Sequence, residues 1–172
     1  MAYDFTGPWT AFSGHHAQLY TPACPTGKSN AQSCASAVTY VRAEGVHAHK
    51  ILLGVPAYGR SFLGATMPGM GYAGCGGEEG VFEYRDLPRP GTDEQVDELA
   101  GAAYCVGGDG GFVSYDNTKT VRMKAEYAMR EGLGGLFYWN AAGDKIGEES
   151  LVQNGWVAMA GSKLDAVTKM CS

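Results

Sequence analysis

Leu133-Gly134-Gly135-Leu136-Phe137-Tyr138-Trp139-Asn140 is the stretch of sequence from which the fold is inferred. Its two glycines interrupt the helical pattern that precedes them, and the bulky run after them is too short for a helix. Such a run is typical of a strand that is buried on both faces of a parallel sheet. The indole of Trp139, at the carboxyl end of this strand, either fills the core or offers a flat apolar face to a ligand.

Two more strands and two helices are predicted upstream of this stretch. Lys50 to Pro56 is a second apolar run, which leads into Ala57-Tyr58-Gly59-Arg60, and Met1 to Phe5 reads as a strand that ends on polar groups. Apolar residues at i, i+3, i+4 and i+7 predict a helix from about Ser33 to Glu44. Another helix is expected from Asp116 or Asn117 to about Glu131. Strands that alternate with helices across short connections predict a parallel α/β sheet.

Residues 61–116 break this alternation and predict a small α+β insertion. Glu79 to Leu87 is expected to form a short helical piece. Ala102 to Val106 and Gly111 to Tyr115 flank a glycine-rich loop, which predicts an antiparallel hairpin. The acidic cluster from Asp93 to Glu98 is expected to be a solvated turn.

The end of the chain predicts two further helices. Ala141 to Asp144 is expected to be a loop, followed by helices from Glu148 to about Ala160 and from Ser162 to about Met170. Leu151, Val152 and Trp156 are expected to pack inward. The acidic pair Glu148-Glu149 is expected to complement the dipole at a helix N-terminus.

Composition limits the kinds of partner that this chain can have. Its 172 residues are long enough to bury a sizeable core, and 45% of them are hydrophobic. A net charge of −5 argues against nucleic acid or an anionic membrane as the main partner. No apolar stretch is long enough to span a bilayer. Because strand-like sequence follows Met1 at once, we expect that the chain is trimmed.

The cysteines and histidines predict structure rather than metal or cofactor chemistry. The sequence contains no C-x-x-C pair, so neither a metal site nor a cofactor is predicted. A disulfide between Cys24 and Cys34 would close one loop, and one between Cys75 and Cys105 would close another, which favours an oxidising compartment. The fifth cysteine, Cys171, would stay unpaired. The adjacent histidines at positions 15 and 16 are expected to be structural or solvated.

The polar end of the first predicted strand has two interpretations. Tyr3 and Asp4 are either an incidental strand end or, together with Trp9, they present a hydroxyl, a carboxylate and a flat apolar face around one pocket.

Three motifs together resemble one family. Met1-Ala2-Tyr3-Asp4-Phe5 with Trp9 and Ser13-Gly14-His15, Gly54 to Phe62, and Gly134 to Trp139 are similar to the carboxyl-terminal part of glycoside hydrolase family 18 chitinases. The resemblance covers nearly the whole chain. It implies strands six to eight of a (β/α)8 TIM barrel, so that three βα units form a partial barrel from residues 1–60 and 117–172. Residues 61–116 would then be the family's insertion domain.

The resemblance also implies roles for individual residues. Members of the family cleave β-1,4 bonds between N-acetylglucosamine units, and the acetamido group of the substrate itself acts as the nucleophile. Tyr3 resembles the tyrosine that holds the acetamido oxygen, and Asp4 resembles the aspartate beside it. Trp139 resembles the indole under the sugar at the cleavage point. The remaining substrate-binding residues that the resemblance implies are Tyr58, Arg60 and Trp9 in neighbouring subsites and Glu78 on the insertion domain.

One departure from the family decides the expected activity. The family's D-x-x-D-x-D-x-E signature, which supplies the general acid, does not occur in this sequence. We therefore assign no catalytic residue and expect a truncated chitinase-like protein that binds chitin oligomers without cleaving them. The alternatives are a fragment of an active chitinase and a non-sugar interaction module. We further expect secretion, and self-association or a complementary chain that covers the open sheet edges.

Overall fold

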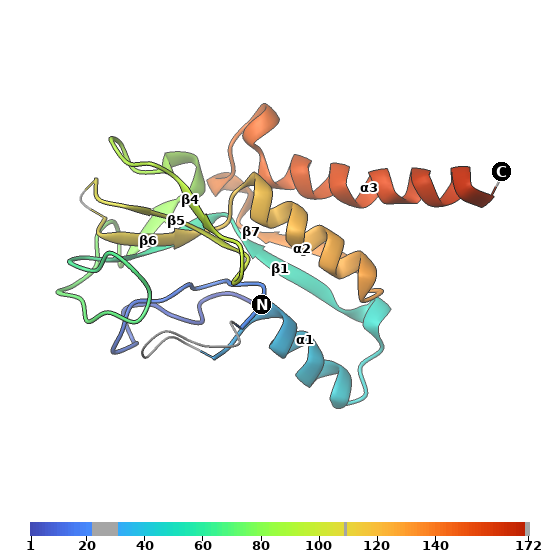
Figure 1. Cartoon of the computed structure of the whole chain (residues 1–172), viewed down its shortest axis with the longest axis horizontal. Helices are drawn as coiled ribbons and strands as arrows, with labels where there is room; N and C mark the ends of the chain where they lie inside the picture. The colour runs from blue at the N-terminus through green and yellow to red at the C-terminus, as the bar shows by residue number, and fades with distance from the viewer. Residues whose placement is uncertain (22–30, 109, 171–172) are drawn as a thin grey trace.

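The computed structural model describes residues 1–21, 31–108 and 110–170, with the backbone alone over 162–170. These described residues form two sheets and three α-helices (Figure 1). The first sheet is a parallel pair of strands, β1 (Leu52–Pro56) and β7 (Gly135–Trp139). The second sheet is antiparallel and has five strands, in the order β3 (Val81–Glu83), β2 (Tyr58–Phe62), β6 (Phe112–Tyr115), β5 (Ala102–Val106) and β4 (Gln95–Asp97).

The parallel pair confirms the two buried strands that the apolar runs predict. Leu53 lies opposite Leu136 and Val55 lies opposite Tyr138, and these residues pack into the two larger core clusters. Figure 1 shows α2 (Thr118–Arg130) and α3 (Leu151–Met170) running side by side along this pair. Among the described strands no third one joins β1 and β7, so the sheet is not closed.

Capping explains where the first two helices begin. α1 (Cys34–Ala43) has Ser33 as its N-cap in a capping box with Ser36. α2 follows Asn117, whose side chain accepts hydrogen bonds from the backbone N–H groups of Lys119 and Thr120. Both helices confirm the prediction to within one or two residues at each end.

The end of the chain differs from the prediction. α3 is one continuous helix, because Gly161 inside a helix costs only about 1 kcal/mol and does not by itself end it. The backbone N–H groups of Leu151 and Val152 bond to the Asp144 carboxylate, which therefore caps α3 in place of Glu148-Glu149. Leu151 is fully buried as expected. The prediction is wrong for Trp156 and Val152, which are 69% and 39% exposed.

Two elements predicted from the sequence, at Met1 to Phe5 and at Glu79 to Leu87, are not formed as expected. Met1 to Phe5 is not a strand; the backbone of Phe5 bonds instead to the carbonyl of His16, and Asp4 leaves the extended conformation with a φ of +61°. Glu79 to Leu87 is not an α-helix. It forms the edge strand β3 and the short 3-10 helix η2 (Tyr84–Asp86), because β2 offers β3 a ladder of hydrogen bonds. Three further 3-10 helices, η1 (Ala48–Lys50), η3 (Ala141–Gly143) and η4 (Gly147–Glu149), lie in connections.

The insertion is mostly sheet. β5 and β6 confirm the predicted hairpin. The acidic cluster is not a solvated turn, because Gln95–Asp97 is β4 and the carboxylate of Glu94 accepts hydrogen bonds from Tyr115 and Asn117. β2 runs across residues 60 and 61, so the division of the chain there stays a prediction.

The cysteines do not form the predicted bridges. Cys34, Cys75 and Cys105 are free thiols, of which Cys34 and Cys105 are buried. The pairing of Cys75 with Cys105 is therefore wrong, and Cys34 is not bridged. Cys24 and Cys171 lie outside the described residues.

Candidate functional site

Polar and aromatic side chains meet where the two sheets join. β1 passes through Ala57 directly into β2, so the chain leaves the parallel pair and enters the antiparallel sheet. The carboxyl ends of β1 and β7 lie at this junction, with Pro56 opposite Trp139. Tyr58 and Trp139 are thereby placed at one edge of the parallel pair, as the strand pattern predicts.

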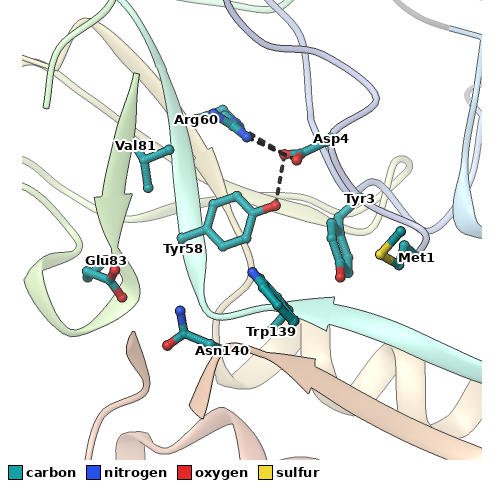
Figure 2. A pocket seen from close by; sticks show the side chains of 9 residues that line it. All are labelled: Met1, Tyr3, Asp4, Tyr58, Arg60, Val81, Glu83, Trp139 and Asn140. Atoms are coloured by element: carbon teal, nitrogen blue, oxygen red, sulfur yellow. Dashed lines mark hydrogen bonds and ion pairs between the residues drawn. The ribbon is translucent and has the colours of Figure 1, made fainter. Parts of the chain in front are cut away.

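A cavity of about 350 Å³ opens at this junction (Figure 2). It brings together five of the seven substrate-binding residues that the sequence predicts, from segments far apart in the chain. They are joined there by four residues that the sequence does not predict to bind substrate. The lining residues are Met1, Tyr3, Asp4, Tyr58, Arg60, Val81, Glu83, Trp139 and Asn140.

Asp4 is the most firmly held side chain of the cavity. Arg60 donates to both of its carboxylate oxygens, Nε to Oδ1 at 2.9 Å and Nη2 to Oδ2 at 3.0 Å, and the Tyr58 hydroxyl donates to Oδ1 at 2.8 Å. Burial alone would raise the pKa of Asp4, but the neighbouring His16 ring and the bonds from Arg60 and Tyr58 hold this pKa well below its ordinary value. Asp4 is therefore an ionised acceptor, and these contacts fix its left-handed backbone.

Tyr3 contributes a buried hydroxyl to the cavity. Its ring packs edge-on against Tyr58 and Phe137 and lies over Gly54, where a Cβ would come within 2.8 Å of the Tyr3 ring. Within the described residues the buried Tyr3 Oη makes no hydrogen bond. Burial, followed by the charge of Asp4, raises the pKa of Tyr3, so the hydroxyl stays protonated and able to donate.

Trp139 supplies a flat surface at the end of β7. Its side chain is 58% exposed, so the core-filling interpretation is wrong. The next residue, Asn140, begins η3 by accepting a hydrogen bond from the backbone N–H of Gly143. Figure 2 shows Trp139 between Asn140 and Tyr3, below the ring of Tyr58.

The two remaining predicted residues lie in adjoining hollows. Trp9 and Arg60 line a second cavity of about 640 Å³, where the guanidinium lies 4.9 Å from the centroid of the Trp9 ring. Glu78 lines a third cavity together with Arg60 and Glu83. Arg60 lines all three cavities and so connects them.

Glu83 is the charged residue of this cavity that the sequence did not predict. The sequence predicts a helix over 79–87, and a helix would not place Glu83 opposite Tyr58. The pairing of β3 with β2 does so. The alternation of side chains along Val81-Phe82-Glu83, with Val81 and Glu83 in the cavity, is the signal that could have found it.

The adjacent histidines serve the structure, as expected, and point to different regions. His15 lies 3.5 Å from the Asp97 carboxylate at the end of β4, and His16 lies 3.5 Å from that of Asp4. Burial lowers the pKa of His16, although Asp4 and then Asp116 act in the opposite direction. In the part of the chain that the structure describes, no group of three His, Cys, Asp or Glu side chains could hold a metal ion.

Comparison with protein families identifies this arrangement. The model for glycosyl hydrolases family 18 matches residues 1–144. The chain belongs to this family. Among related sequences, sporulation-specific chitinase 2 of Saccharomyces cerevisiae is 34% identical over 87% of this chain and 32% of its own length. Chitinase A1 of Niallia circulans is 33% identical over 84% of this chain and 23% of its own length.

Solved structures of the family share the fold. The Group IV chitinase of Ostrinia furnacalis matches with a TM-score of 0.81 and 27% identity over 93% of this chain and 49% of that one. Human YKL-39, described as a pseudo-chitinase with retained chitooligosaccharide binding, matches with a TM-score of 0.83 and 24% identity over 93% of this chain and 49% of that one. The family 18 chain therefore has a mixed α/β fold that resembles part of these TIM-barrel structures, and it spans about half of their length or less. Among the described helices, none combines the length and apolarity needed to cross a bilayer.

Proposed function

We propose that this chain binds chitin or N-acetylglucosamine oligomers in the cavity between its two sheets and does not cleave them. The observation that supports this proposal is the composition of one wall of the cavity. There the exposed face of Trp139 lies near the ionised carboxylate of Asp4 and the hydroxyl of Tyr3, which has no hydrogen-bond partner among the described residues. An aromatic face, a free donor and a fixed acceptor are the three groups that an acetylated amino sugar needs.

Each group has a separate task in this proposal. Trp139 stacks under the C–H face of a pyranose ring, the Tyr3 hydroxyl donates to the acetamido oxygen, and Asp4 accepts a hydrogen bond from the same unit. Tyr58 and Arg60 orient Asp4 and line the neighbouring position. Trp9, beside Arg60, would extend the site into the second cavity, and Glu78 would reach it from the insertion.

Hydrolysis is not expected from the chain by itself. Protonation of the leaving oxygen needs a carboxylic acid, and the family's signature that carries this acid does not occur in the sequence. Loss of a general acid lowers the rate by about two to four orders of magnitude. Turnover of a chromogenic chitobioside by the purified chain would instead favour the alternative, that the chain is a fragment of an active chitinase.

Partners and location are part of the same proposal. β1 and β7 each lack a second neighbour among the described strands, so we propose that self-association or a complementary chain covers these edges. A monodisperse monomer in light scattering would contradict this. Secretion stays in the proposal, although the free thiols of Cys34, Cys75 and Cys105 remove the disulfide argument for it.

Calorimetry with chitin tetramer to hexamer tests the binding. We expect dissociation constants from about tens of micromolar to millimolar, because one wall of a cleft supplies only a few kcal/mol. Trp139→Ala and Tyr3→Phe should weaken binding. Trp156→Ala, which removes an exposed indole on α3, should leave it unchanged. Equal weak heats in all of these proteins would favour the non-sugar interaction module.

A further inference from the structure

Glu83 occupies a defined place beside the proposed sugar platform. In the antiparallel pair of β2 and β3, Tyr58 lies opposite Glu83 and Arg60 lies opposite Val81. Directly opposed residues project from the same face of a sheet, so these four side chains all line the cavity. Figure 2 shows Glu83 and Asn140 on the other side of Tyr58 from Asp4.

The two carboxylates of the cavity differ in how their charges are balanced. The charge of Asp4 is matched by Arg60, which binds both of its oxygens. Glu83 has neither a hydrogen bond nor an ion pair through its side chain to any other described residue. Glu78 and Glu79 line the adjoining cavity together with Glu83, and the cation of that cavity is Arg60, already bound to Asp4. This side of the cavity therefore carries uncompensated negative charge.

The carboxylate of Glu83 lies in close contact with the backbone of another segment. It lies against Gly143 in η3, so closely that a Cβ at this glycine would collide with Glu83 Oε2. The apolar side chain of Val81 lies beside it on β3, and the indole of Trp139 lies in the same cavity. A cation bound there would lose part of its water, which strengthens its attraction to the carboxylate.

We propose that Glu83 determines specificity by favouring an amino sugar whose amine is free and protonated, next to the acetylated unit that stacks on Trp139. The inference rests on the proposed function and gives its ligand class as partly de-N-acetylated chitin oligomers. An acetamido group is neutral and gains nothing from the charge of Glu83. A glucosamine ammonium forms an ion pair with it, whereas the Tyr3 hydroxyl and Asp4 still select the acetylated neighbour.

Calorimetric titration with two tetramers of equal length tests this inference. One probe is the fully acetylated N-acetylglucosamine tetramer, and the other is the same tetramer partly de-N-acetylated, both at about pH 6 and low salt. We expect the chain to bind the second probe about two- to five-fold more tightly, the range for a partly exposed ion pair. Glu83→Gln should abolish this preference and leave the affinity for the acetylated tetramer unchanged. Glu126→Gln, an equal change of charge at an exposed position of α2, should retain it.

The outcomes separate this inference from the function on which it rests. Equal affinity of the chain for both tetramers, or the same preference in Glu83→Gln, overturns the role of Glu83 and leaves chitin-oligomer binding intact. Absence of binding to either tetramer overturns the proposed function and the inference with it. Raising the salt concentration to about 0.2 M should reduce the preference, because screening weakens an exposed ion pair. A preference that does not depend on salt contradicts an ionic origin.

Discussion

The two sheets of this molecule solve the problem of burial differently. The five-stranded antiparallel sheet pairs its central strands on both sides and buries Phe62, Phe112 and Val113 completely. The parallel pair β1–β7 packs one face against helices, while residues of its opposite face, such as Leu52 and Trp139, stay more than half exposed. The antiparallel sheet therefore has its central strands fully buried, whereas the parallel pair supplies the accessible face of the proposed site.

A buried ion pair joins these two regions. Asp116 follows β6 of the antiparallel sheet, and Lys124 lies on α2, which packs along the parallel pair. Their side chains are 1% and 0% exposed, and Lys124 Nζ bonds to Asp116 Oδ2. Thr120 donates a second bond to the same carboxylate at 2.8 Å. Both charges therefore have a partner inside the fold, at the point where β6 leads into α2.

Removing one charge of this pair should have the largest effect. We expect Lys124→Met to lower the free energy of unfolding by about 3–5 kcal/mol, because the carboxylate of Asp116 is left buried without a cation. Urea denaturation followed by circular dichroism measures the change. Lys119 lies on the same helix as Lys124 and forms an exposed ion pair with Glu98. Lys119→Met breaks that pair, is the matched control and should cost no more than about 1 kcal/mol. A similar small loss in both variants would show that the buried pair stabilises the fold no more than the exposed one.

Matched truncations of phenylalanine compare the two sheets directly. Phe62→Ala should cost about 3–5 kcal/mol, because it opens a cavity in a fully buried cluster. Phe137→Ala, on the open face of β7 where the ring contacts Tyr3, should cost about 2 kcal/mol less, since this side chain is already partly solvated. Thermal and urea unfolding of both variants measure the difference. Equal losses would mean that the exposed face of β7 is as well packed as the antiparallel sheet.

The parallel pair was predictable because its signals are local. Leu52 to Pro56 and Leu136 to Trp139 are short apolar runs bounded by glycine or proline. The start of α2 is likewise marked by its N-cap residue, Asn117. The motifs at Tyr3, Tyr58 and Trp139 were enough to place these side chains in one cavity.

Features that depend on tertiary contacts could not be predicted from the sequence. Lys124 has the pattern of a solvated helix residue, and only the fold places it against Asp116. Glu83 is brought into the cavity by the pairing of β3 with β2. The local sequence of β2 does not predict which strands pair with it. Met1 to Phe5 has the composition of a strand but joins neither sheet, and side-chain contacts of Asp4 hold it instead.

Loosening Asp4 should have an intermediate effect. Arg60→Met removes the two bonds to the carboxylate and leaves the one from Tyr58, so we expect a loss of about 1–2 kcal/mol in unfolding free energy. Weaker binding of the chitin tetramer should accompany it, because Asp4 is no longer fixed. Arg42→Met, which breaks an exposed pair with Glu131, should change neither quantity measurably. Unchanged binding in Arg60→Met would argue against Asp4 as a ligand contact.

The smallest expected effect concerns the acid stability that Asp97, at the end of β4, contributes to the fold. The His15 ring, whose Nε2 lies 3.5 Å from the carboxylate, outweighs burial and, with backbone bonds from Ala100 and Leu99, lowers the pKa of Asp97 to about 2. A carboxylate whose pKa is lower in the folded than in the unfolded chain, where it is about 3.9, stabilises the fold above that unfolded value. Asp97→Asn should therefore cost less than about 1 kcal/mol at pH 6, a figure reduced by solvent screening of this partly exposed group. The difference from the unmodified chain should shrink as the pH falls from about 4 towards 2. Urea midpoints measured across this range test the sign, and a difference that grows on acidification would contradict the pairing of Asp97 with His15.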